Sequence, residues 1–115
     1  MSTLLSFGRD VQGYNAYAPM PSTDTYSATL AANTPVSVTV PSNHQVWIAS
    51  FNYTPGASVY VNFTGAAAAP PAGSTLALTT STLNPGQRTV LAGQTISVIS
   101  DAAVDVVIEL YPTNY

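Results

Sequence analysis

The chain has 115 residues and a formal net charge of −3, and only 6% of its residues are charged while 46% are hydrophobic. This composition excludes a disordered chain, which needs low hydrophobicity and high charge. Two Lys/Arg residues are too few to neutralise a phosphate backbone, so we expect no nucleic-acid partner. The absence of cysteine excludes disulfides and thiolate chemistry. No apolar run approaches the roughly 18 residues of a membrane-spanning helix, so we expect no membrane partner.

The first segment, residues 1–25, has neither the alternation of a strand nor the period of a helix, and its prolines favour an extended path. It carries more large apolar side chains than a solvated linker would. We therefore predict an extended N-terminal arm over 1–25 that contacts a partner. The residues expected to make that contact are Phe7, Arg9, Tyr14, Tyr17 and Met20.

From residue 26 to residue 115 the pattern changes to short β-branched runs separated by turn residues, which predicts one all-β domain. Strand and turn signals at this spacing are typical of an antiparallel β-sandwich, and we expect a jelly-roll. The predicted strands are 26–32, 36–40, 46–53, 58–63, 74–78, 81–83, 88–91, 95–100 and 104–111. We expect 46–53 and 58–63 to form a hairpin, because Pro55-Gly56 suits a type II turn between them.

The strand 46–53 is apolar on both faces. Val46 and Ile48 share one face, and Trp47, Phe51 and Tyr53 lie on the opposite face. One of the two faces must be covered by something other than the ordinary core: the arm, a loop or another chain. We predict Trp47, Phe51 and Tyr53 as a partner-binding or arm-covered face. The last strand is simpler, since Val104, Val106, Ile108 and Leu110 alternate with more polar neighbours and predict one core-facing side.

Groups that perform chemistry are scarce. His44 is the only histidine and lies in a loop, so we expect it to pack there rather than to act as a base. The carboxylates Asp101 and Asp105 lack the spacing and turn glycine of a calcium loop. The sequence therefore predicts no catalytic residues, no metal site and no cofactor.

Two segments carry a family resemblance: Ser6-Phe7-Gly8-Arg9-Asp10-Val11-Gln12-Gly13-Tyr14, which leads into the Tyr/Pro-rich arm, and the later run 83–98 around Asn84-Pro85-Gly86-Gln87-Arg88. The chain resembles the small virion structural proteins of tailed bacteriophages. With a β-sandwich after an arm it looks most like a jelly-roll head decoration, or cement, protein.

The resemblance implies a protein made in the host cytoplasm that ends on the capsid surface of the virion. It would bind the major capsid protein or another virion protein noncovalently, as a homo-oligomer (dimer or trimer). Two alternatives stay open: a collar, tail or fibre-associated virion module, and a carbohydrate-binding sandwich. The second would stack sugars on exposed aromatics such as Trp47, Tyr60 or Tyr111.

Overall fold

A computed structural model describes residues 21–71 and 73–113 of the chain as an all-β fold without a helix in those ranges. The predicted arm residues Phe7, Arg9, Tyr14, Tyr17 and Met20 lie outside the described residues. Eight strands follow one another along the chain. They are β1 (Asp24–Leu30), β2 (Val36–Thr39), β3 (Val46–Tyr53), β4 (Val59–Asn62), β5 (Ser81–Leu83), β6 (Gln87–Leu91), β7 (Thr95–Ser100) and β8 (Val104–Pro112).

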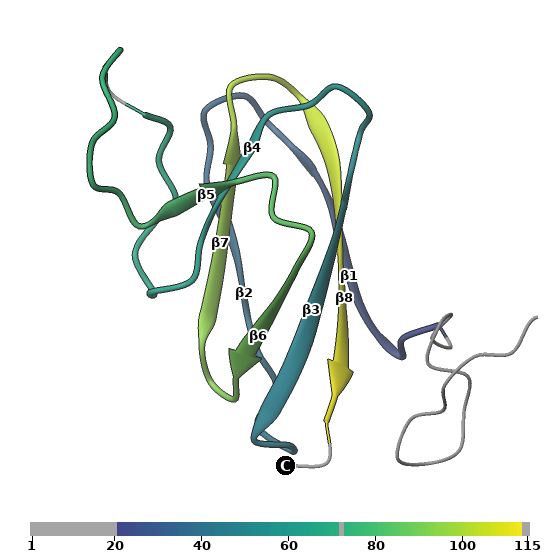
Figure 1. Cartoon of the computed structure of the whole chain (residues 1–115). Helices are drawn as coiled ribbons and strands as arrows, with labels where there is room; N and C mark the ends of the chain where they lie inside the picture. Colours follow the sequence, from purple (N-terminus) through teal and green to yellow (C-terminus); the bar gives the residue numbers. More distant parts are fainter. Residues whose placement is uncertain (1–20, 72, 114–115) are drawn as a thin grey trace, which may run out of the picture.

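The strands form two four-stranded antiparallel sheets that face each other (Figure 1). One sheet has the order β1-β8-β3-β6 and the other has the order β2-β7-β4-β5. The first strand therefore pairs with the last, β2 with β7, β3 with β6 and β4 with β5. This nesting of pairs across two sheets is the jelly-roll arrangement, and it confirms the predicted fold class.

Most predicted strands are present within one or two residues of their expected limits. β1 begins at Asp24, two residues before the predicted start, and Ser22 is held against β8 by a hydrogen bond from its hydroxyl to the Leu110 carbonyl. The predicted strand 74–78 is wrong, because those residues lie in the long β4–β5 connection and pair with no strand.

The predicted hairpin of β3 and β4 is also wrong. The turn itself forms as expected, with Gly56 at φ 81° and the Ala57 N–H donating to the Thr54 carbonyl at 3.0 Å. However, β3 and β4 belong to different sheets, so this turn carries the chain across the sandwich. Every connection except β4–β5 crosses in the same way.

The core lies between the two sheets and is built from the inward residues of each strand. In β8 the alternation is as predicted: Val104, Val106, Ile108 and Leu110 are buried, and the residues between them are more exposed. Trp47, Val61, Ile96 and Val98 join them, and Val38 packs against this cluster while partly exposed.

Candidate docking surfaces

The face of β3 that carries Trp47, Phe51 and Tyr53 points into the sandwich, which corrects the prediction that it is a partner-binding or arm-covered face. Trp47 is 0% exposed and donates its indole N–H to the His44 carbonyl at 3.1 Å. Phe51 is buried and stacks on Tyr53, with ring centroids 6.3 Å apart. The opposite sheet supplies the cover, so these three aromatics are core residues.

Tyr53 is the one member of this set that reaches the edge of the core. Its hydroxyl donates to the Pro85 carbonyl at 2.8 Å, which ties β3 to the turn before β6. Burial raises the pKa of Tyr53 well above its usual value, and the nearby Arg88 guanidinium lowers it by a smaller amount. The side chain is therefore a neutral hydrogen-bond donor at physiological pH.

The outer face of β3 is the uncovered one. Val46 lies opposite Leu91 of β6, and Ile48 lies opposite Tyr111 of β8, so the four side chains share one face. Ile48 is 38% exposed and Leu91 is 57% exposed. We call Val46, Ile48, Leu91 and Tyr111 the outer-sheet patch. Glu109 accepts a hydrogen bond from the Tyr111 hydroxyl at 3.0 Å and places a carboxylate at the border of the outer-sheet patch.

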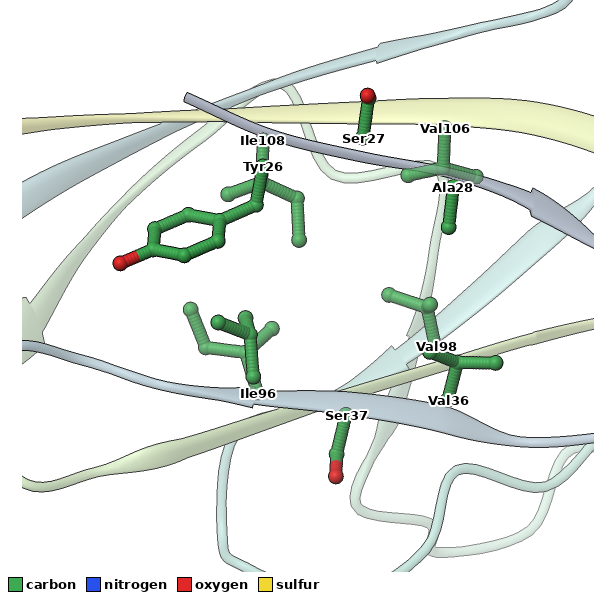
Figure 2. Close-up of a pocket in the computed structure, with 10 residues that line it drawn as sticks. Tyr26, Ser27, Ala28, Val36, Ser37, Ile96, Val98, Val106 and Ile108 are labelled. Carbon is green, nitrogen blue, oxygen red and sulfur yellow. The ribbon is translucent and has the colours of Figure 1, made fainter. Parts of the chain in front are cut away.

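A second apolar feature opens between the edge strands β1 and β2, where the two sheets do not close on each other. A cavity of about 180 Å³ lies there, and we call it the β1–β2 groove. Figure 2 shows Tyr26 and Ile108 facing Ile96 across the gap, while the hydroxyls of Ser27 and Ser37 point away from it. None of the described residues that line the groove is charged.

The β4–β5 connection carries a third apolar feature that the sequence pattern misassigned. Leu76 and Leu78 are fully exposed on the part of this loop that extends away from the sandwich (Figure 1). The base of the loop is fixed by Asn62, which is buried and bonds Thr64 on one side and Thr80 on the other, each at 2.7 Å. The predicted strand 74–78 does contain apolar residues, but its sequence carries no information on whether another part of the fold covers them.

The groups weighed for chemistry make packing and hydrogen-bond contacts. The rings of His44 and Trp47 pack nearly perpendicular to each other, with centroids 5.5 Å apart, which agrees with a packing role for His44. Asp105 accepts a hydrogen bond from the Thr29 hydroxyl at 2.6 Å. In the part of the chain that the structure describes, no three His, Asp or Glu residues gather into a possible metal site. The same residues contain no helix that could cross a membrane.

The arrangement of residues 21–71 and 73–113 therefore offers surfaces for apolar contact. The sequence shows that β3 is apolar on both faces, but the face predicted to bind a partner or the arm is the one that packs in the core. The groove was not predicted, because it depends on how two edge strands meet. No family model, curated protein or solved structure matches this chain.

Proposed function

We propose that this protein is a phage virion structural protein that decorates the capsid by noncovalent binding to the lattice of the major capsid protein. The family resemblance of the sequence motivates the proposal, and the jelly-roll architecture is compatible with it. Small modules of this kind need a folded body and a surface for docking, and the described residues provide both.

The observation that carries the proposal is the outer-sheet patch. It places exposed aliphatic side chains, Ile48 and Leu91, together on one face of the sheet. Burying apolar surface stabilises an interface by about 25 cal/mol per Å² before the costs of association. In a chain with so few charges, apolar contact of this kind is the main source of affinity available.

The proposed location on the capsid is tested by mass spectrometry of purified virions, which measures the amount of this protein relative to the major capsid protein. Decoration requires copies in proportion to the capsid lattice. A small fixed number per particle would instead indicate a collar, tail or fibre module. Absence from particles, together with binding of the free protein to glycans, would replace the proposal with the carbohydrate-binding alternative. Of the three aromatics named for that alternative, Trp47 is buried, and Tyr60 and Tyr111 are half-buried stacking surfaces.

The contact itself is tested with Ile48→Asp, which places a charge at the centre of the outer-sheet patch. We expect this variant to stay folded, because the side chain is partly exposed, and to lose binding to undecorated shells. The matched control is Ser27→Asp, which adds the same charge on the exposed side of β1 in the same sheet. Equal binding by both variants and the unmodified protein would show that the patch is not the contact.

A further inference from the structure

The β1–β2 groove is an opening into the hydrophobic core. Its lining comes from both sheets and includes Ile96, Val98, Val106 and Ile108, all of which belong to the buried core. Tyr26 and Val36 stand at this opening and are 36% and 40% exposed. Core side chains that line an open, uncharged cavity gain contacts if another apolar group enters.

The backbone around the groove is also unpaired on one side. β1 pairs only with β8, and β2 pairs only with β7, among the strands of the described chain. Both strands are therefore sheet edges with a free row of N–H and C=O groups, which can bond an extended segment laid beside them. The groove thus offers an apolar cavity and main-chain hydrogen-bonding groups together.

The size of the cavity selects one kind of side chain. At about 180 Å³ it is close to the ~150 Å³ of an engineered apolar cavity that binds benzene. Among the described residues, the lining has no charged group to pair with an ionised occupant. The groove therefore suits an extended, uncharged segment that presents one aromatic ring on the face that enters.

We propose that the occupant is residues 13–18 of a second copy of this chain, with the ring of Tyr14 in the groove. The sequence Gly13-Tyr14-Asn15-Ala16-Tyr17-Ala18 has no charge and no proline, so it can pair as a strand. In extended form, Tyr14, Ala16 and Ala18 share one wholly apolar face. The opposite face carries Asn15, whose amide would lose its hydrogen bonds if it were buried, so the Tyr14 face is the one that enters.

The starting point of the described chain favours a second copy over the same chain. Ser22 is bonded to Leu110, and Asp24 lies opposite Leu110 in the register, so the chain enters β1 at the end of the sheet. To reach its own groove, the segment would have to reverse direction between Ala18 and β1. Pro21 has no N–H to close a turn that begins at Ala18, and proline is disfavoured at the third position of turns that begin at Tyr17 or Pro19, so the two prolines oppose a tight reversal there. This inference does not depend on the proposed function.

The absence of cysteine from the chain allows a direct test by crosslinking of single-cysteine variants. Ala16→Cys protein with a mass tag is mixed with untagged Val36→Cys protein under mild oxidation, using full-length chains. We expect a disulfide-linked heterodimer, because Ala16 would lie beside the exposed Val36 at the groove. The control replaces Val36→Cys with Thr89→Cys, an exposed position on β6 away from the groove. Heterodimer no more abundant than in this control would overturn the proposal.

Sedimentation velocity of the full chain gives an independent readout. We expect the full chain to form oligomers. Tyr14→Ser should raise their dissociation constant at least tenfold. Tyr17→Ser, on the other face of the segment, should change the dissociation constant less than threefold. A monomeric full chain would overturn the proposal, including the case in which the segment docks into its own groove. Equal effects of the two substitutions would overturn the assignment of Tyr14 as the ring that enters.

Discussion

At the scale of single residues, two asparagines with positive φ have different roles. Asn84 (φ 43°) accepts the Val59 N–H at 2.7 Å and donates to the Ala57 carbonyl at 2.9 Å, so its side chain joins the β5–β6 turn to the β3–β4 turn. Asn33 (φ 59°) has no side-chain hydrogen bond to the described residues. Asparagine tolerates this backbone region better than alanine in both places.

We predict that Asn84→Ala lowers the free energy of unfolding by about 3 kcal/mol, about 1 for each lost hydrogen bond and about 1 for the left-handed backbone. Asn33→Ala should lose only the last contribution, about 1 kcal/mol. Urea unfolding of both variants measures the difference. Equal losses would show that the side-chain bonds of Asn84 add little to the fold.

The buried phenol of Tyr53 makes stability depend on pH in the alkaline range. Because burial raises its pKa in the folded state above the usual 10.0, the folded state prefers the neutral phenol. The resulting stability is complete below pH 10 and is lost as the pH rises above that value, since the unfolded chain releases the proton first. We predict that stability falls more steeply with pH above 10 in the unmodified protein than in Tyr53→Phe. Urea unfolding at a series of pH values measures both slopes, and parallel slopes would contradict the prediction.

At the scale of elements, β3 shows why one strand can have two apolar faces. Trp47 is fully buried between the sheets, whereas Ile48, its neighbour in the chain, is 38% exposed on the outer-sheet patch. We predict that Trp47→Ala costs about 3–5 kcal/mol of stability, because it leaves a large cavity. Ile48→Ala, the matched change on the other face, should cost under about 1 kcal/mol. Thermal unfolding of the two variants compares them, and a similar cost for both would mean that the faces of β3 are assigned the wrong way round.

The same strand marks the limit of what the sequence predicts. The position of β3 in the chain, and the set of residues in β8 that point inward, both follow from the sequence pattern. In a strand a period of two fixes which residues share a face. The choice of inner face in β3 does not follow, since both sides are apolar and only the facing sheet decides. The sequence predicts the type of turn at Gly56 but not which sheet the chain enters after it. Local φ values do not determine whether the next strand joins the same sheet.

At the scale of the whole molecule, the jelly-roll results from pairings between the two ends of the chain. Asp24 lies opposite Leu110, and β8 joins β1 and β3 at the centre of its sheet. Such distant pairs must form against a large loss of chain entropy, so their order cannot be read from any local pattern. The fold class was predictable from strand spacing, but the β1–β2 groove and the outer-sheet patch became visible only with the two sheets in place.

The few charges of the molecule lead to a prediction about every assembly that it forms. The net charge is only −3, the described lining of the groove is uncharged, and Glu109 is the carboxylate at the border of the outer-sheet patch, so association depends mainly on burial of apolar surface rather than on ion pairs. Salt screens exposed charges strongly but has little effect on apolar contact. We therefore predict that raising salt from low concentration to about 0.5 M changes the affinity of self-association, and of binding to capsid shells, by less than threefold. Sedimentation and shell co-pelleting across the salt series measure the two affinities, with thermal unfolding in the same buffers as the control for the fold. A tenfold loss of affinity with an unchanged melting temperature would show that the isolated charges, Arg9 and Glu109 among them, make the decisive contacts.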